Sequence, residues 1–514
     1  MASIQKTNSK TIAKNTMFLY FRMMVTMVIS LYTSRVVLQV LGVDDFGIYQ
    51  AVGGIVGFLS FINNALGTGS SRFITFGLGE GNKEKLKNIF STTLTGHVIL
   101  ALLIVIAAET VGLWFLCNKM TFPPDRFYAA LWVFHLSVLT AFFTITQIPF
   151  NACIIAHEKM SVYAYVSIID AVCKLLIVYM LTIGQMDKLI LYAILHAILQ
   201  LSILVFYRIY SLRHFEEAHI RFFIDKKMLR EIGAFSGWSL FANGSIALNS
   251  QGVLILLNMF FSPAVVAARA LSLQVRMAAG HFVSNFQIAS NPQIVKLYAA
   301  KDYGGSKKLL LQTARFSYYL MLILSLPICL TANQLLHLWL SVVPEYTVVF
   351  LQLAIVQSLF HVFDVSFYRA LYVKGRLREN ALISPTIGFF VFPIIYILFK
   401  LGYSPVALSW AYLLDTMLLG LVVKPLLVIR IVDYTWKDIL SVFRPCLIVT
   451  LVSLPIPLMT YYFFQYSDKD LLSFLIIVLV SILSVVLSCW FLGINTSQRK
   501  TLLGMVSAKV NRLS

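Results

Sequence analysis

Arginines within long apolar stretches are the residues of this sequence whose chemistry is easiest to infer. Arg269 and Arg276 are seven residues apart, which places both on one face of a helix, about 10 Å apart along its axis. Arg22 and Arg35 lie in the first apolar stretch. A guanidinium stays charged and binds phosphate through paired hydrogen bonds, so we expect these four residues to bind an anionic substrate. Snorkelling to the membrane surface, or pairing with buried acids, is the alternative.

A polar stripe lies within another apolar stretch. Gln357, His361, Asp364 and Tyr368 follow one another at spacings of four, three and four, so one helix face carries all of them. Asp364 and His361 are therefore candidates for binding a coupling ion or proton. Hydrogen bonding between helices explains the same stripe equally well.

Three further polar residues in apolar stretches are candidates for ion coupling or substrate binding. Each of them also has a simpler, structural explanation. Asp170 is a third ion-coupling candidate, but Lys174 follows it at i+4, and the spacing favours a self-neutralising ion pair. Asn64 and Asn249 suit the hydroxyl groups of a sugar. Close packing of the small-residue helices on which they lie is the alternative.

The elements that carry these residues are fourteen apolar stretches. The chain is 59% hydrophobic and 12% charged, and about 20 apolar residues of helix cross a bilayer. The sequence predicts an all-α polytopic membrane protein, because these stretches are too long and too uniformly apolar for barrel strands. The expected spans are 16–40, 46–68, 89–109, 127–150, 161–183, 188–208, 232–257, 263–290, 313–336, 347–371, 380–400, 404–429, 443–463 and 470–492.

The basic residues predict the orientation of these spans. Most of the 41 Lys and Arg residues fall in the two termini and every second loop, and few fall on the other side. This asymmetry places both termini in the cytoplasm and supports an even number of spans. The net charge of +19 therefore indicates membrane orientation and contact with anionic membrane lipids, not a nucleic-acid partner.

A weak internal repeat predicts the domain organisation. The loop 80–86, Glu-Gly-Asn-Lys-Glu-Lys-Leu, recurs as 303–309, Tyr-Gly-Gly-Ser-Lys-Lys-Leu, with six helices between the copies. We expect two pseudo-symmetric six-helix lobes, related by an axis along the membrane normal, and an appended C-terminal hairpin. The corresponding ranges are 1–220, 221–435 and 436–514.

The sequence offers no sign of an enzyme. It has no phosphate-binding loop motif, no nucleophile-elbow motif and no metal-spaced Cys/His cluster, so no catalytic residue, cofactor or metal is expected. The largest expected extracytoplasmic loop, 110–126, is short for a membrane glycosyltransferase or polysaccharide polymerase. Such an enzyme is the least favoured alternative.

Several segments resemble Wzx-type polysaccharide flippases of the multidrug/oligosaccharidyl-lipid/polysaccharide exporter superfamily. These segments are 15–20 (Asn-Thr-Met-Phe-Leu-Tyr), 34–38 (Ser-Arg-Val-Val-Leu), 41–49 (Leu-Gly-Val-Asp-Asp-Phe-Gly-Ile-Tyr) and 70–72 (Ser-Ser-Arg). The resemblance implies two lobes around a central cavity and alternating access. It also implies that undecaprenyl-pyrophosphate-linked oligosaccharide is moved across the bacterial cytoplasmic membrane for O-antigen or other lipopolysaccharide synthesis, with other polysaccharide assembly proteins as partners.

The resemblance also bears on the arginines. In related lipid flippases the first and eighth helices border a lateral gate, and here those helices carry Arg22, Arg35, Arg269 and Arg276. An ion-coupled multidrug exporter of the same superfamily is the close alternative. Exporters usually bind cations through buried carboxylates in the N-terminal lobe, where Asp170 is the one clear deep acid.

The topology is testable by cysteine labelling. Single cysteines at Lys119, Gly184, Glu345 and Lys469 are expected to react with a membrane-impermeant reagent from outside the cell, because each lies in a loop of the side poor in basic residues. Protection of a cysteine at Glu345 would contradict the fourteen-span arrangement.

Overall fold

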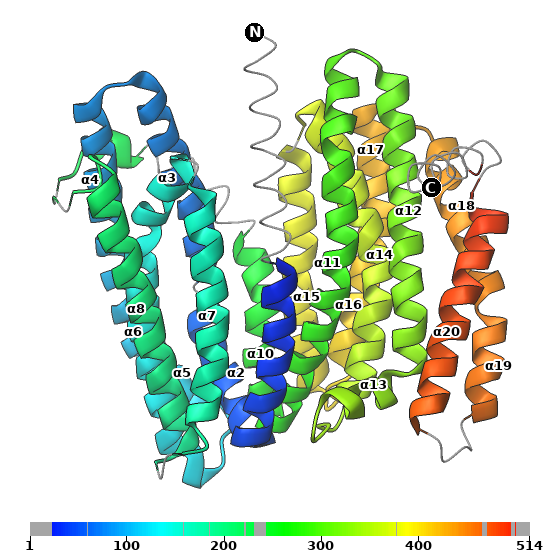
Figure 1. The fold of residues 1–514 in the computed structure, drawn as a ribbon, viewed down its shortest axis with the longest axis horizontal. Coiled ribbons are helices and arrows are strands. Elements are labelled where there is room, and N and C mark those ends of the chain that lie inside the picture. Colours follow the sequence, from blue (N-terminus) through cyan, green and yellow to red (C-terminus); the bar gives the residue numbers. More distant parts are fainter. Residues whose placement is uncertain are drawn as a thin grey trace, which may run out of the picture. The chain divides into compact units, whose positions relative to one another are not determined.

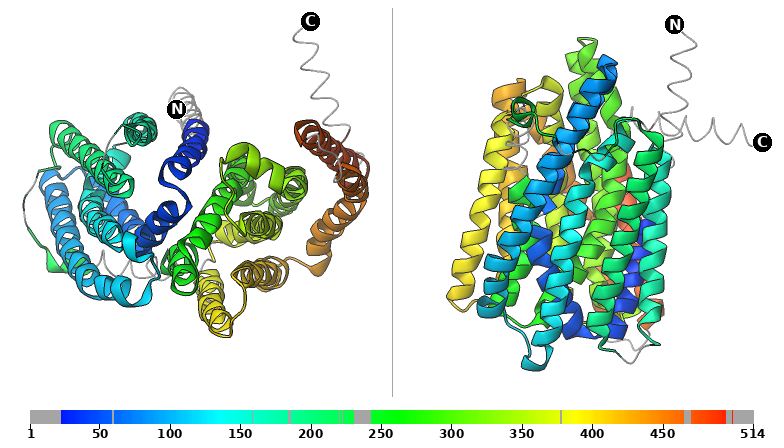
Figure 2. Two further views of the ribbon diagram at one scale, coloured as in Figure 1. Left: turned by 90° about the horizontal axis from the view of Figure 1, so that it is seen from below. Right: turned by 90° about the vertical axis from the view of Figure 1, so that its left-hand side faces the viewer.

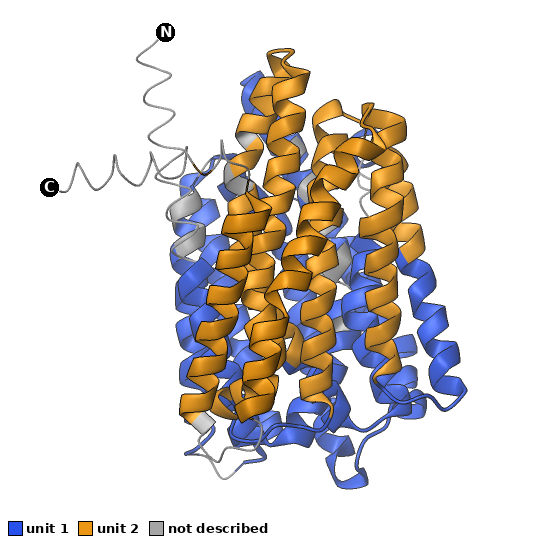
Figure 3. Ribbon diagram, turned by 90° about the vertical axis from the view of Figure 1, so that its right-hand side faces the viewer, with its two compact units in different colours: residues 1–271, 340–345, 388–405 blue, residues 272–339, 346–387, 406–514 orange. Residues whose placement is uncertain are grey.

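A computed structural model describes residues 23–58, 60–157, 159–183, 186–219, 221, 223–230, 243–376, 378–464, 470–494 and 499. These described residues form helices and connecting turns and contain no β-strand, which confirms the all-α fold class (Figure 1). The chain divides into two compact units, coloured separately in Figure 3. Unit 1 comprises 1–271, 340–345 and 388–405, and unit 2 comprises 272–339, 346–387 and 406–514.

Unit 1 contains the helices from the first half of the chain. In order they are Met23–Leu41, α2 (Val43–Phe58), α3 (Ser60–Glu80), α4 (Lys83–Ala107), α5 (Leu113–Lys119), α6 (Phe127–Ala156), α7 (Met160–Met180), α8 (Lys188–His214), α10 (Val253–Phe260) and the start of α11 (Pro263–Ala299). A π-helical turn, Ala108–Gly112, joins α4 to α5, and another, Leu248–Gly252, precedes α10.

Unit 2 contains most of the remaining helices. They are the rest of α11, then α12 (Tyr303–Leu330), α13 (Ala332–Trp339), α14 (Thr347–Lys374), the first part of α15 (Arg378–Lys400), α16 (Ala407–Met417), α17 (Lys424–Val432), α18 (Trp436–Ser453), α19 (Pro455–Phe464) and α20 (Asp470–Ser488). The π-helical turn Leu418–Val423 joins α16 to α17 without a break.

Where the structure describes them, the expected spans agree with these helices over most of their length; residues 16–22 of the first span and 232–242 of the seventh lie outside the described residues. Ten helices of the described residues are long and apolar enough to cross a membrane, so the protein is a multi-pass membrane protein. The total of fourteen spans stays a prediction. One expectation is wrong: most of the predicted loop 110–126 is helical, because the helix that starts at Lys83 continues to Lys119. The helix Lys83–Lys119 is only weakly amphipathic, so its hydrophobic pattern does not indicate where it ends.

Helix α6 is the centre of unit 1. It packs against α2, α3, α4 and α8 (Figure 2 shows the helices end-on). Phe90 and Phe150 meet edge to face, with ring centroids 5.3 Å apart, in the hydrophobic core between α4 and α6. Near the start of α2, a Cβ at Gly47 would lie 1.9 Å from the carbonyl oxygen of Pro263. Only glycine allows this contact, which explains the second glycine of the 41–49 segment.

Helices α12 and α14 are the centre of unit 2. The C-terminal helices α18 and α20 both pack on α12. Tyr318 of α12 stacks on Phe363 of α14, and its hydroxyl is 2.9 Å from that of Thr450 on α18. Tyr319 donates a hydrogen bond of 3.2 Å to the carbonyl of Gly493. The hairpin expected from the sequence is thus joined to α12 by polar as well as apolar contacts.

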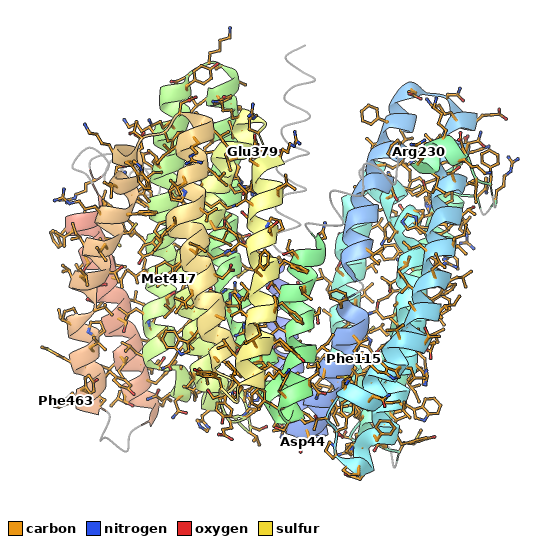
Figure 4. The ribbon with its side chains drawn as sticks, turned by 180° about the vertical axis from the view of Figure 1, so that it is seen from behind. Asp44, Phe115, Arg230, Glu379, Met417 and Phe463 are labelled. Carbon is orange, nitrogen blue, oxygen red and sulfur yellow. The ribbon has the colours of Figure 1, made fainter. Side chains whose placement is uncertain are left out.

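One arginine joins the starts of three helices in unit 1. The Nε atom of Arg126 donates to Asp45 at the start of α2 (2.7 Å), and its Nη1 atom donates to Asp187 (2.5 Å). Asp187 also caps α8 by accepting from the backbone N–H groups of Leu189 and Ile190. Figure 4 shows Asp44 at this end of the bundle and Arg230 at the opposite end. Burial by itself raises the pKa of Asp187, but the hydrogen bonds from Arg126 and Ile190 outweigh it and lower that pKa.

Replacing this arginine is expected to weaken unit 1. Arg126→Gln leaves two partly buried carboxylates without their cation, so the free energy of unfolding should fall by about 1–3 kcal/mol. The lowered pKa of Asp187 means that its stabilisation is present above its ordinary pKa and is lost as the pH falls through the lowered value. The difference in Tm between wild type and variant should therefore shrink below about pH 4. Arg213→Gln, at an exposed arginine, is the control; equal losses of Tm in both variants would contradict the assignment.

Candidate functional site

The stripe expected on the tenth span lies on α14 in unit 2, and Asp364 is its centre. The Oδ1 atom of Asp364 is 3.0 Å from the Nζ atom of Lys424 on α17. The Lys424 side chain is 3% exposed, and that of Asp364 is 20% exposed. A partly buried acid and a buried base thus neutralise one another between two helices.

Two other side chains complete the surroundings of the Lys424 ammonium. It donates a hydrogen bond to the Oδ1 atom of Asn380, near the start of α15. It also lies 5.4 Å from the ring centroid of Tyr368, one turn along α14 from Asp364. A carboxylate oxygen, an amide oxygen and an aromatic face are three groups that stabilise a cation.

Further titratable groups lie on the other side of Asp364. The Nδ1 atom of His361 is 3.6 Å from its Oδ2 atom. Asp415 on α16 is close enough for the two carboxylates to interact electrostatically. His361 also interacts electrostatically with Arg276 and Lys424. One connected group of charges therefore extends from α11 to α17 in unit 2.

The backbone explains why Lys424 reaches α14. The π-helical turn Leu418–Val423 comes directly before it and adds a residue to the helical turn, which rotates the following residues. In this turn a Cβ at Gly420 would lie 2.6 Å from the carbonyl oxygen of Phe360. Glycine thus permits the close approach that brings Lys424 to Asp364. Met417, which precedes the turn, is labelled in Figure 4.

Lys424 is the residue that sequence reasoning missed. It lies within the expected span 404–429, but it was not among the candidate residues, although it is a buried residue of the helix that runs from Ala407 to Val432. A signal was available: a lysine inside an apolar run needs an acidic partner, and Asp364 and Asp415 lacked a cation.

The stripe on α14 serves two purposes. The Nε2 atom of Gln357 donates to the hydroxyl of Thr416 on α16 at 2.8 Å, which is the hydrogen bonding between helices that the alternative interpretation expected. Tyr368 and His361 instead lie around the ion pair. Among the described residues, no cluster of three or more His, Cys, Asp or Glu side chains is arranged to hold a metal ion.

The expected arginines have different surroundings. Arg276 of unit 2 donates one hydrogen bond from Nε to Ser358 (3.3 Å) and makes no other hydrogen bond or ion pair to the described residues. Arg269, in the unit 1 part of α11, is 3% exposed. Arg35 is partly buried on the helix Met23–Leu41 and makes no ion pair within the described part of the chain. Arg22 lies outside the described residues.

A polar cavity of about 460 Å³ lies inside unit 1, and Asp170 lines it with Lys174, His196, Gln50, Ser30 and Thr33. The Lys174 ammonium is 2.8 Å from one oxygen of Asp170, and Gln200 donates to the other at 3.3 Å. The self-neutralising ion pair expected from the i, i+4 spacing is confirmed.

The two asparagines are not brought to these clusters. Asn249 lies on the π-helical turn Leu248–Gly252, and its Nδ2 atom donates to the carbonyl of Ser245 at 2.9 Å. It also lies against Gly388, where a Cβ would be 3.0 Å from its Nδ2 atom. The side chain of Asn64 on α3 lies outside the described residues.

Known structures share this fold. A structure titled "Lipid II flippase MurJ, inward closed conformation" matches with a TM-score of 0.69 and 13% identity, over 93% of this chain and 98% of that chain. An inward-facing multidrug resistance MATE family transporter of the MOP superfamily matches with a TM-score of 0.65 and 15% identity, over 80% and 98%. A MOP superfamily transporter from Pyrococcus furiosus, whose title reports a binding pocket of reverse polarity, matches with a TM-score of 0.58 and 15% identity, over 82% and 97%.

No family model and no curated protein matches the sequence. The structural matches are nevertheless extensive and cover nearly the whole of each known chain. The chain therefore has the fold of the multidrug/oligosaccharidyl-lipid/polysaccharide superfamily, which is found in both flippases and exporters. The sequence resemblance to this superfamily is confirmed at the level of the fold.

The contact at Gly420 is testable. Gly420→Ala places a methyl group against the carbonyl of Phe360, so we expect the free energy of unfolding to fall by about 1–3 kcal/mol. Gly280→Ala on α11 is the matched control, because nothing lies within 4 Å of its added Cβ and alanine favours a helix. Thermal unfolding in detergent compares them; a control at least as unstable as Gly420→Ala would contradict the close approach.

Proposed function

We propose that the protein is a flippase that moves undecaprenyl-pyrophosphate-linked oligosaccharide across the bacterial cytoplasmic membrane for surface polysaccharide synthesis. In this proposal both termini are cytoplasmic, and the lipid-linked saccharide is released to extracytoplasmic assembly proteins. The lobes are the ranges 1–220 and 221–435, with 436–514 as the added hairpin. Transport proceeds by alternating access.

The extent of the structural likeness is the observation that carries this proposal. The MATE transporters are matched over nearly their whole length but cover only 80–82% of this chain. The lipid II flippase covers 93%. The lipid II flippase thus matches more of this chain than the drug exporter does, which favours a lipid-linked substrate.

The charges of the site support an anionic substrate. Arg276 makes a single hydrogen bond among the described residues, and Arg35 makes no ion pair there, so both guanidinium groups can bind phosphate oxygens. We assign Arg22 and Arg269 to the binding of the same anionic substrate. We assign Asn64 and Asn249 to the saccharide hydroxyls.

A multidrug exporter is the second candidate, because structures of MATE multidrug transporters also match this chain. Its cationic substrates would need a free carboxylate in unit 1. Asp170 is the candidate there, but both of its oxygens already have partners in Lys174 and Gln200. The ion pair therefore favours the flippase.

Energy for transport must come from a gradient, since the sequence has no nucleotide-binding motif. We propose that Asp364 and His361 take part in this coupling, with Asp170 as the corresponding acid of unit 1. Carboxylates can exchange a proton or an ion partner during a conformational cycle.

The anion site is tested with arginine variants in the native host. Arg276→Ala and Arg269→Ala should each reduce surface polysaccharide by about 10- to 100-fold, the effect of losing one charge-assisted contact to pyrophosphate. Arg276→Lys should restore part of the export, because lysine keeps the charge but loses the paired hydrogen bonds.

Membrane abundance is measured in parallel. Arg315→Ala on α12 is the control, because Arg315 lies near Tyr319 and Cys446 on the side of the hairpin helices. Full export by the Arg269→Ala/Arg276→Ala double variant would refute an anion site at these residues. Resistance to cationic drugs that depends on Asp170, with unchanged polysaccharide, would favour the exporter.

A further inference from the structure

The surroundings of Lys424 form a cation site inside unit 2. The Nζ atom has the Asp364 carboxylate at 3.0 Å, the Asn380 amide oxygen as hydrogen-bond acceptor, and the Tyr368 ring at 5.4 Å. With 3% of the side chain exposed, these partners take the place of water. Carboxylate and carbonyl oxygens are the ligands that hard cations prefer in proteins.

The orientation of Asn380 supports this description. Its Oδ1 atom accepts from Lys424 and also from the hydroxyl of Ser384, one turn further along α15. The amide oxygen is therefore directed at the ammonium by a second hydrogen bond. A side chain held with its acceptor towards a cation is a feature of a built site.

The charged groups around the site are two carboxylates and the cations that face them. Asp364 and Asp415 supply two carboxylates, while Lys424, Arg276 and, when protonated, His361 supply the positive charges facing them. Tyr368 and Tyr412 are the phenols of the same region. Removing the Lys424 ammonium would leave Asp364 without its closest positive charge, which is costly inside a membrane.

We propose that the Lys424 ammonium is a tethered cation that occupies a monovalent-cation site formed by Asp364, Asn380 and Tyr368. The site is filled by the chain itself, so unit 2 takes up no Na⁺ or K⁺ from solution there. Because Lys424 lies on α17 and Asp364 on α14, movement of these helices makes or breaks the contact without ion exchange. The proposal deepens the proposed transport function, and its test needs no substrate.

The test is the thermal unfolding of the purified full-length protein in detergent. NaCl, KCl or methylammonium chloride replaces choline chloride at constant ionic strength. The Tm of the wild type is expected to be the same in all four salts. Lys424→Ala vacates the site beside Asp364, so its Tm should be lower in choline and should rise saturably, by a few degrees, with methylammonium or Na⁺.

Two variants identify the site. Lys424→Ala/Asp364→Asn removes the negative charge and should lose the response to cations. Lys374, at the end of α14, forms an ion pair with the exposed Asp433. Lys374→Ala removes this lysine, and its Tm should show no response to the added cations. If Lys424→Ala yields no folded protein, Lys424→Gln serves instead, because it keeps a donor for Asn380 but removes the charge.

Two results would overturn the proposal. One is a saturable Na⁺ or K⁺ shift in the wild type that Asp364→Asn abolishes, since the site would then accept solution ions beside the lysine. The other is a folded Lys424→Ala or Lys424→Gln protein whose Tm ignores all three cations. Neither result depends on polysaccharide export, so the flippase function is judged separately by the arginine variants.

Discussion

The cost of a charge in a membrane-spanning helix bundle governs the interior of this protein, because hydrocarbon offers no hydrogen bonds to an ion. The two units meet this cost differently. In unit 1, Asp170 and Lys174 pair within one helix, so their contact survives any movement of that helix as a rigid element. In unit 2, Asp364 and Lys424 pair between α14 and α17, so their contact depends on how these two helices pack.

A pair between helices places demands on the backbone. The π-helical turn before Lys424 and the glycine at position 420 both depart from a regular, well-packed helix, and each is unfavourable by itself. They are retained where they bring a charge to its partner. The irregular backbone and the polar cluster in unit 2 are therefore parts of one arrangement.

The fold by itself does not distinguish a lipid flippase from a drug exporter, since known structures of both share it. The distribution of partners is more informative. Asp170 and Asp364 are each neutralised by a lysine, whereas Arg276 has a single hydrogen bond among the described residues. Arg276 can therefore offer its positive charge to a ligand, which fits a substrate that carries phosphate.

The sequence by itself determined the helical membrane class, the approximate spans and the Asp170–Lys174 pair, because hydrophobic length and i, i+4 spacing are local properties of one helix. Only the tertiary structure decided the partners of Asp364. Lys424 and Asn380 lie on other helices, and their approach depends on packing and on a π-helical turn that leaves no mark in the hydrophobic pattern. The helix at 113–119 was not predicted for a similar reason. In the sequence, an apolar helix that continues beyond the bilayer has the same hydrophobic pattern as one that ends in a loop.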